Sequence, residues 1–324
     1  MPAHRTTGNP AHVEPAGGGG AGTPARRITH TPPRPPPAGV PLPESPAPRV
    51  ARPLRRALAV VFLLVVAGLP AGSSSAGGSG PGTVRVLQMN LCNSGRAGCY
   101  TGGSVRRAAE VIAAERPDVV TLNEICRDDV DTLARALAAV RPGGRVVPAF
   151  QAAGDRPSRA ATRCVNGQAY GIGLVARLAG PGARAGAHRG TYPAQDLADP
   201  EERVWLCLHA AAVLHACTTH LANTDGAVAL AQCAHLLDTV VPAIRRDAGY
   251  APTVLGGDLN LRAGGAPDVR SCVPPGYRRV DDGARQQIMA TTDVTICCRR
   301  AVDMRGTTDH PALVATLTVD RPPR

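Results

Sequence analysis

Residues 117–124 of the chain read Pro-Asp-Val-Val-Thr-Leu-Asn-Glu. The apolar residues at 119–122 predict a short buried strand. Pro117 ends the helix expected before it, because proline lacks the amide hydrogen that a helix interior needs. Glu124 then places a carboxylate where this strand ends. A helix, a breaker, a buried strand and a terminal acid predict an α/β arrangement with a polar side chain at one edge of a sheet.

Other predicted strands also end in, or lead into, polar side chains. We expect these strands, from their apolar and β-branched residues, over 84–91, 213–219, 253–256 and 313–319. The polar residues at their ends are Asn90, His220, Asp258, Asn260, Asp309 and His310. One polar residue leaving a strand is typical of a turn. Together with Glu124, however, these are the residue types that bind hard metal ions and transfer protons, so we take them as one candidate site.

The rest of the chain predicts few crossover helices. Helices are expected over 104–115, 128–140 and 226–246. Further strands are expected over 146–150, 171–176, 204–208 and 288–291. Ser104 is a good N-terminal cap for the first helix, and Pro242 can interrupt the third. The predicted fold class is α/β, with two mixed β-sheets packed face to face and flanked by helices, because a doubly wound parallel sheet needs more helices.

The first 82 residues differ in composition from the remainder. Residues 1–53 hold 14 of the 31 prolines and show no periodicity, which predicts a disordered leader. Residues 54–76 carry arginines, an apolar run over 57–69 and then small residues, the pattern of a secretory signal. As a helix the run reaches roughly 20 Å, short of a bilayer core of about 30 Å; an uncleaved membrane anchor is the alternative. We expect a linker over 77–82 and one folded domain over 83–324.

All ten cysteines follow the apolar run: Cys92, Cys99, Cys126, Cys164, Cys207, Cys217, Cys233, Cys272, Cys297 and Cys298. An even set beyond a secretion signal predicts disulfide bonds, and the closely spaced ligand pairs of a zinc site are missing. Two pairings suit the sequence, namely Cys92 with Cys99 in a small loop and Cys207 with Cys217 across a hairpin. The adjacent Cys297 and Cys298 suit neither a zinc site nor a simple bridge to each other.

The composition excludes several classes of protein. The chain has 36 basic and 25 acidic residues, every basic side chain is arginine, and only eight residues are aromatic. Residues 1–76 contain eight of the arginines and two of the acids, so the formal charge falls from +11 to +5 without them. A hydrophobic content of 44% excludes a wholly disordered chain. The scarcity of aromatic side chains disfavours a reader of single-stranded nucleic acid.

Five segments together resemble the endonuclease/exonuclease/phosphatase superfamily, of the deoxyribonuclease I type. They are 117–124, Gly-Gly-Asp-Leu-Asn at 256–260, Thr-Asp-His-Pro at 308–311, the strand that starts at Tyr170 and ends at Arg177, and Glu202-Arg203. The resemblance runs from about 84 to 319. It implies a four-layered α/β sandwich, and we identify the chain as similar to secreted members of actinobacterial type.

The resemblance implies hydrolysis of a phosphodiester with a divalent metal ion, Mg²⁺ or else Mn²⁺ or Ca²⁺. In that reading Glu124 holds the metal with Asn90 and Asp309. The catalytic residues are Asp258 and Asn260 at the attacking water and His220 and His310 at the scissile phosphate. Arg177 and Arg203 are expected to anchor phosphate, with a structural salt bridge as the alternative for each.

One position departs from the family pattern. Members carry an aspartate in a strand about two dozen residues before the Asp-His pair, and this aspartate orients the second histidine. Here the strand reads Arg-Gln-Gln-Ile-Met-Ala-Thr over 285–291, which places Gln286 at that position. A glutamine can fix a histidine tautomer but cannot stabilise an imidazolium as a carboxylate does. The alignment predicts that Gln286→Asp does not lower activity; Asp293 is the nearest acid downstream.

These observations favour a secreted, monomeric, metal-dependent phosphodiesterase, and among such enzymes an endonuclease acting on nucleic acid. The mildly basic domain and the arginines Arg156, Arg159 and Arg163 suit a nucleic-acid partner. The alternatives are a phospholipase C of the sphingomyelinase type, a small-molecule phosphoesterase, and a non-catalytic binding protein on the same scaffold. If the apolar run is retained, the protein is instead anchored to the membrane with an extracellular domain.

Overall fold

The computed structural model describes residues 82–179, 185–210 and 214–319, and more of these residues lie in strands than in helices. These residues all fall within one compact unit, Gly72–Arg324. The predicted leader over 1–53, the signal or anchor over 54–76 and nearly all of the linker lie outside the described residues, so those predictions stand untested.

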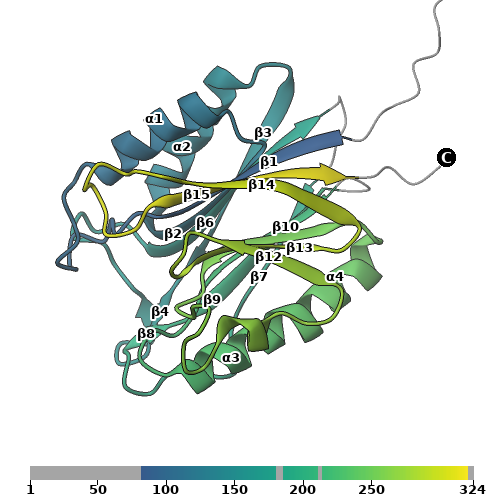
Figure 1. Ribbon diagram of the computed structural model, residues 1–324. Helices are drawn as coiled ribbons and strands as arrows, with labels where there is room; N and C mark the ends of the chain where they lie inside the picture. The colour runs from purple at the N-terminus through teal and green to yellow at the C-terminus, as the bar shows by residue number, and fades with distance from the viewer. Residues whose placement is uncertain (1–81, 180–184, 211–213, 320–324) are drawn as a thin grey trace, which may run out of the picture. The chain divides into compact units, whose positions relative to one another are not determined.

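The first sheet has six strands in the order β14-β15-β1-β2-β6-β3 (Figure 1). Their bounds are β14 Val294–Val302, β15 Ala312–Val319, β1 Gly82–Asn90, β2 Val119–Cys126, β6 Tyr170–Ala179 and β3 Gly144–Ala152. Within this sheet β1 and β2 run parallel and the other neighbours are antiparallel.

The second sheet has the same plan, in the order β12-β13-β11-β10-β9-β7. Its strands are β12 Tyr277–Asp281, β13 Gln286–Thr291, β11 Thr253–Asp258, β10 Leu214–His220, β9 Val204–Ala210 and β7 Ala185–Thr191. Here β10 and β11 are the parallel pair. A small third sheet joins β5 Ala160–Ala161, β4 Gly154–Asp155 and β8 Glu201–Glu202.

Helices cover the outer face of each large sheet (Figure 1). The first sheet carries α1 Ser104–Glu115 and α2 Arg127–Val140, and the second carries α3 Gly226–Ala234, a π-helical turn His235–Val240 and α4 Val241–Ala248. A 3-10 helix spans Val269–Cys272. The π-helical turn stands immediately before Pro242, whose missing amide hydrogen breaks the regular ladder. The predicted third helix is therefore present but irregular.

Three hydrophobic clusters fill the spaces between these layers. Leu87 and Leu122 of the first sheet pack against α1 and α2, and Leu255 of the second sheet packs against the α3–α4 helix. Between the sheets, Leu174 belongs to the same cluster as Leu206 of the other sheet. The helix over Gly226–Ala248 is long and apolar enough to span a membrane, but its buried side chains line the second of these cores. The predicted four-layered α/β sandwich is confirmed.

Most predicted elements are present, several with wider bounds. The first helix ends at Glu115 as predicted, but its N-cap is Gly103 without a side-chain hydrogen bond, so the prediction that Ser104 is the cap is wrong. Strand β2 extends four residues past 122. The prediction missed three longer strands, β7, β12 and β14, all at sheet edges. Edge strands bury less of each residue, so their apolar alternation is weak.

The described residues contain four disulfide bonds: Cys92–Cys99, Cys126–Cys164, Cys207–Cys217 and Cys233–Cys272. The two suggested pairings are confirmed, the second because the antiparallel register sets Cys207 opposite Cys217. Cys297 and Cys298, the adjacent pair that suited neither a zinc site nor a simple bridge, have free thiols.

Candidate active site

The strand registers bring the polar residues to one end of both sheets. In the first sheet the parallel register sets Asn90 opposite Asn123, one residue before Glu124. In the second sheet it sets His220 opposite Asp258. The carboxyl ends of parallel strands meet at the same edge, and the two sheets pack face to face. The four strand ends therefore surround a common space.

That space is a cavity of about 440 Å³. It is lined by predicted site residues from both sheets and by loop residues: Ser94, Arg96, Ala97, Cys99, Glu124, Thr162, Tyr170, Asp199, Glu201, Arg203, His220, Asn223, Asp258, Asn260, Arg285, Asp309 and His310. Six of the seven predicted catalytic and metal-binding residues lie on its wall. The seventh, Asn90, lies behind two of them and bonds their carboxylates.

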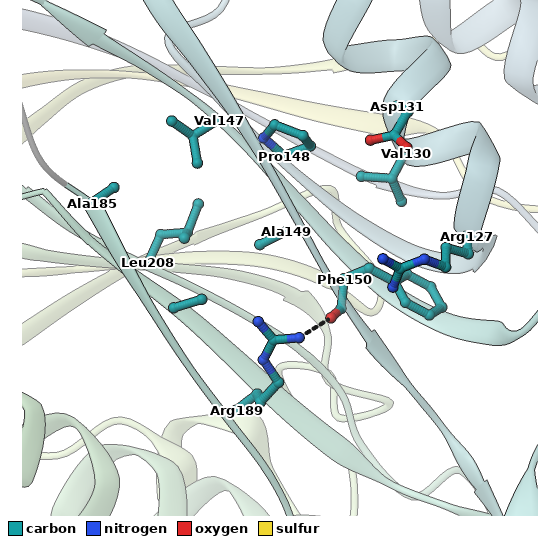
Figure 2. Close-up of a pocket in the computed structure, with 11 residues that line it drawn as sticks. Arg127, Val130, Asp131, Val147, Pro148, Ala149, Phe150, Ala185, Arg189 and Leu208 are labelled. Atoms are coloured by element: carbon teal, nitrogen blue, oxygen red, sulfur yellow. Dashed lines mark hydrogen bonds between the residues drawn. The ribbon is translucent and has the colours of Figure 1, made fainter.

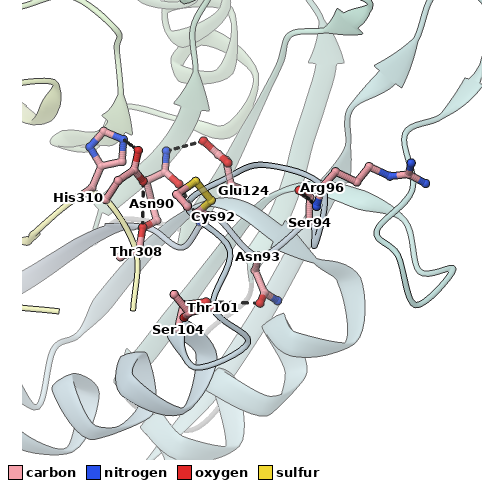
Figure 3. Close-up of a disulfide and its surroundings, with 12 residues drawn as sticks. Asn90, Cys92, Asn93, Ser94, Arg96, Thr101, Ser104, Glu124, Thr308 and His310 are labelled. Atoms are coloured by element: carbon pink, nitrogen blue, oxygen red, sulfur yellow. Dashed lines mark hydrogen bonds and ion pairs between the residues drawn. A yellow bond between two sulfur atoms is a disulfide. The ribbon is translucent and has the colours of Figure 1, made fainter. Parts of the chain in front are cut away.

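Glu124 sits on an irregular part of β2. Its φ of 53° is left-handed, and the pairing of β2 with β6 shifts between Leu122 and Ile125. A bulge of this kind re-aims a side chain, and a non-glycine residue in this conformation is strained. Asn90 Nδ2 donates to Glu124 Oε1 at 2.8 Å (Figure 3). Burial raises the pKa of the Glu124 carboxyl, and the neighbouring charge of Asp258 raises it further.

Asp258 is held by donors on several sides. Its Oδ2 accepts from Gln286 Nε2 at 2.7 Å and from Asn90 Nδ2 at 3.1 Å, and lies 3.4 Å from His310 Nε2. Its Oδ1 accepts the backbone N–H of Asn260 at 3.0 Å. Asn260 has a φ of 52°, and its Nδ2 donates to the carbonyl of Leu221 at 2.9 Å. Oδ1 therefore keeps capacity for a further donor, whereas Oδ2 is crowded.

Gln286 serves this carboxylate rather than a histidine. The antiparallel register of β11 and β13 sets it directly opposite Asp258. Gln88 Nε2 donates to Gln286 Oε1 at 2.9 Å, which leaves the Gln286 amide hydrogens pointing at Asp258. Among the described residues no hydrogen bond joins Gln286 to His310. The expectation that this position orients the second histidine is therefore not met by the contacts of this chain.

The two histidines lie on either side of the carboxylates. His220 Nε2 is 3.9 Å from Glu124 Oε1, and burial, with Arg203 nearby, lowers the pKa of His220 well below its usual range. His220 is therefore neutral at physiological pH. His310 Nε2 lies 3.7 Å from Asp309 Oδ2, whose side chain is about half exposed. The hydroxyl of Thr308 donates to the carbonyl of Asn90 and ties this segment to β1 (Figure 3).

The two predicted phosphate anchors are placed differently. Arg203 lines the cavity, is buried, and bonds Asp199 at 2.8 Å. Arg177 does not reach the cavity, since it lies seven residues along β6 from Tyr170, roughly 23 Å away at the rise of a strand. It pairs there with Asp118 at 3.5 Å. The salt-bridge alternative describes Arg177, and Arg203, although it lines the cavity, is also paired, with Asp199 and Glu201. Asp293 accepts from the Tyr250 hydroxyl and does not line the cavity.

Several cavity residues escaped the sequence analysis. Tyr170 starts β6, which runs antiparallel to β2, so this end of β6 lies beside Glu124. Its hydroxyl bonds Glu201, a residue whose pKa is raised to about 7 because it is desolvated by burial. Arg285 directly precedes β13, and Asn223 follows His220 by three residues. The sequence could have indicated Arg285 and Asn223 by their closeness to strand ends that were already identified. A search for family motifs does not examine such neighbours.

The Cys92–Cys99 disulfide closes a loop on the rim of the cavity (Figure 3). Between its two cysteines the loop supplies Ser94, Arg96 and Ala97 to the cavity wall. Arg96 Nε donates to the carbonyl of Arg163 at 2.8 Å, which fixes the guanidinium group at the rim. The disulfide thus holds the loop that carries Arg96 at the rim of the cavity.

A second cavity, of about 270 Å³, lies between the edge strands β3 and β7 (Figure 2). In its wall Arg189 donates to the carbonyl of Phe150 at 3.2 Å, and Arg127 lies 5.6 Å from the centre of the Phe150 ring. It contains none of the predicted site residues. The first cavity is therefore the candidate active site.

No family model matches the chain, and no curated protein matches it. Solved structures do. An endonuclease/exonuclease/phosphatase from Beutenbergia cavernae DSM 12333 is 20% identical with a TM-score of 0.53, over 73% of this chain and 72% of that one. The catalytic domain of human Nocturnin, with bound sulfate, is 16% identical with a TM-score of 0.53, over 74% and 93%. ANGEL2, a 2′,3′-cyclic phosphatase in complex with adenosine-2′,3′-vanadate, is 14% identical with a TM-score of 0.52, over 74% and 96%.

These likenesses establish the fold. The chain has the architecture of the endonuclease/exonuclease/phosphatase proteins, as the sequence resemblance predicted.

Proposed function

We propose that the protein is a secreted, metal-dependent phosphodiesterase that cleaves nucleic acid. The observation that carries the proposal is the convergence of Glu124, Asp258, His220 and His310 on one cavity, from strands of two different sheets. Structures that share this fold include a 2′,3′-cyclic phosphatase, which is a phosphoester hydrolase. Fold alone does not assign a reaction, so the proposal rests on the site.

The donor set fits a hard divalent cation. The cavity wall carries five carboxylates, Glu124, Asp199, Glu201, Asp258 and Asp309, against three guanidinium groups, Arg96, Arg203 and Arg285. The raised pKa of Glu124 has burial as its first cause and nearby carboxylates as further causes. Carboxylate and amide oxygens are the ligands that Mg²⁺, Mn²⁺ and Ca²⁺ take.

We assign the metal to Glu124 and Asp309, with Asn90 as a further oxygen ligand. Asn90 Oδ1 accepts the backbone N–H of Cys92 at 3.1 Å and keeps a second lone pair. Bound there, the cation would neutralise phosphate charge and stabilise the leaving oxygen.

The residues of the second sheet act on the attacking water. Asp258 Oδ1, which accepts one backbone N–H, has a lone pair free to accept a proton of that water. Asn260, held in a left-handed conformation, lies beside it and orients the water. The donors on Oδ2 fix the plane of the Asp258 carboxylate, and this fixed geometry lowers the entropic cost of attack.

The cationic and imidazole groups hold the phosphate. His220 is neutral, so it donates one hydrogen bond and does not compete with the metal for the carboxylates. His310 Nε2 lies 3.4 Å from Asp258 Oδ2 and 3.7 Å from Asp309 Oδ2, so both carboxylates hold its ring at the site. Arg203 and Arg285 place positive charge at the wall. Together these donors would stabilise the charge that develops on the phosphate oxygens.

Two features favour a nucleic-acid substrate and an extracellular location. Arg96 and Arg285 line the cavity, and a phosphate backbone is recognised chiefly by such charges. The four disulfides are typical of proteins folded in an oxidising compartment, which agrees with the signal expected over 54–76.

One observation favours a lipid substrate as the second candidate. Exposed apolar side chains stand on loops next to cavity residues: Tyr100 follows Cys99, Val165 donates its amide to the carbonyl of Ser94, and Leu197 is 83% exposed two residues before Asp199. A phospholipase C of the sphingomyelinase type needs apolar contacts of this kind at the bilayer surface. These side chains do not form one continuous patch in the contacts described, so the nucleic-acid substrate remains the first proposal.

The test is a substrate comparison with the full chain, disulfides intact. Plasmid DNA, sphingomyelin vesicles and a bis-aryl phosphodiester are each incubated with Mg²⁺ or with EDTA. Asp258→Ala should lower the rate by about 10²–10⁴-fold. Asp293→Ala is the matched control, because it removes a carboxylate that does not line the cavity.

Nicking of plasmid that needs Mg²⁺, is lost in Asp258→Ala and is kept in Asp293→Ala supports the proposal. Turnover of vesicles or of the small diester alone, with the same dependence on Mg²⁺ and Asp258, would assign a different substrate and support the same mechanism. Equal rates for the two variants would reject the site assignment. No turnover with any substrate would favour a binding protein.

A further inference from the structure

Cys297 and Cys298 are the two cysteines outside disulfide bonds, and both side chains are exposed. Their Sγ atoms are 3.0 Å apart, about 1 Å longer than a disulfide bond. The phosphoesterase site does not use them. In a protein with four disulfides, an exposed pair of touching thiols is a separate chemical feature.

A bulge makes this contact possible. Neighbouring residues of a strand normally point to opposite faces of the sheet. In β14, however, Ile296 pairs with Leu317 and Cys298 pairs with Thr316, so Cys297 is an extra residue between them. Such an extra residue bends the strand and breaks the alternation. Because β14 is an edge strand, both thiols remain open to solvent.

The surroundings of the pair are strongly basic. Cys298 lines a cavity of about 280 Å³ together with Arg85, Arg299 and Arg300. Arg300 is neutralised, since its Nη2 bonds both carboxylate oxygens of Glu115 at 2.6 Å. Arg85 and Arg299 instead donate their guanidinium hydrogens to the backbone carbonyls of Glu115 and Asp281. Positive charge of this kind attracts anionic partners.

We propose that Cys297 and Cys298 form a redox site that closes into a vicinal disulfide by exchange with a small anionic disulfide. The Cys298 thiolate attacks the incoming disulfide, forms a mixed disulfide and releases one thiolate. The Cys297 thiolate then attacks Cys298 Sγ and releases the second. The protein pair loses two electrons and two protons, and the small disulfide becomes two thiols.

The closed bond is expected to be reversible. Neighbouring Cα atoms are about 3.8 Å apart, below the usual separation of about 4.4–6.8 Å for disulfide-bonded residues, and departures from that geometry make the bond easier to reduce. The site therefore cycles under conditions that leave the four other disulfides intact.

The experiment uses the full chain with this pair reduced and its two free thiols counted by alkylation. Oxidised glutathione is the anionic probe, and cystamine is a cationic probe of the same reaction. With oxidised glutathione, the wild-type mass should fall by two hydrogens, two glutathione molecules should be released per chain, and the peptide containing 297–298 should resist alkylation. Cystamine should react at least about tenfold more slowly if the arginines attract the partner.

One single and one double variant identify the steps. Cys297→Ser should stop at a stable glutathione adduct on Cys298, whereas the double variant Cys297→Ser/Cys298→Ser should not react and shows that the other disulfides do not exchange. Both positions are exposed, so circular dichroism should show unchanged folding. A wild-type protein that accumulates the adduct, forms a covalent dimer or keeps both thiols alkylatable would overturn the proposal.

Discussion

Replacing Gln286 by Asp tests how the Asp258 carboxylate is held. Gln286 Nε2 donates to Asp258 Oδ2 at 2.7 Å, and the glutamine is itself oriented by Gln88. Asp at this position has no hydrogen to donate. The family alignment alone predicts that Gln286→Asp keeps activity, because family members carry an acid there. The contacts of this chain predict the opposite result.

The magnitude follows from two terms. Loss of a hydrogen bond to a charged group costs about 1.5–3 kcal/mol. Asp is one methylene shorter than Gln, so the new carboxylate would lie roughly 4 Å from Asp258, where two like charges repel by about 4 kcal/mol at an effective dielectric constant of about 20. That repulsion disfavours the state in which both carboxyls are ionised.

The assay is the pH dependence of kcat/KM with Mg²⁺, on whichever phosphodiester is turned over. We expect a loss of about 10- to 100-fold at pH 7 and an acidic limb moved to higher pH, because a protonated Asp258 cannot accept a proton from water. Gln286→Met is the control, since it removes the donor without adding a charge and should lower the rate without moving the limb. An unchanged or higher rate in Gln286→Asp would refute this reasoning and restore the family alignment.

Four further substitutions test other contacts. Cys92→Ser opens the 92–99 loop and should raise KM about tenfold, a change of about 1.4 kcal/mol, in steady-state assays. Arg203→Ala should lower kcat/KM at least tenfold, whereas Arg177→Ala should leave it unchanged and cost at most about 1 kcal/mol in urea unfolding. The pKa of Glu201 is raised from 4.5 to about 7. Its contribution to the free energy of unfolding is therefore fully present below pH 4.5 and is lost as the pH rises through 7. Glu201→Gln should therefore flatten the fall in unfolding free energy, at most about 3 kcal/mol, between those pH values.

The sequence predicts the layers and the strand ends well, for a physical reason. Buried strands such as β2 and β11 are mostly apolar over their first four residues, and a charged residue that follows such a run stands out. The helix over Ser104–Glu115 is equally clear, since it is bounded by glycine before it and by Pro117 after it. Position along a strand then fixes the end of the sheet at which each side chain lies.

The remaining features depend on pairing, which a single sequence does not specify. Gln286 reaches Asp258 because β13 pairs with β11, and nothing local to residue 286 indicates that register. Arg177 was misplaced for a similar reason. It shares a strand with Tyr170, but the cavity lies at the other end of that strand. The bulge that joins Cys297 to Cys298 is also a property of the pair β14–β15.

The two central carboxylates have opposite surroundings, and this difference supports different tasks for them. Asp258 is contacted by neutral amide donors, Asn90 and Gln286, and by a backbone N–H, so its charge is already stabilised by the protein. Glu124 has one amide donor, and burial and like charges raise its pKa. A bound cation therefore stabilises the charge of Glu124 more than that of Asp258. Asp258 is instead suited to accept a proton in a fixed direction. An acid at position 286 would erase this difference, which is why a glutamine there is consistent with an active enzyme.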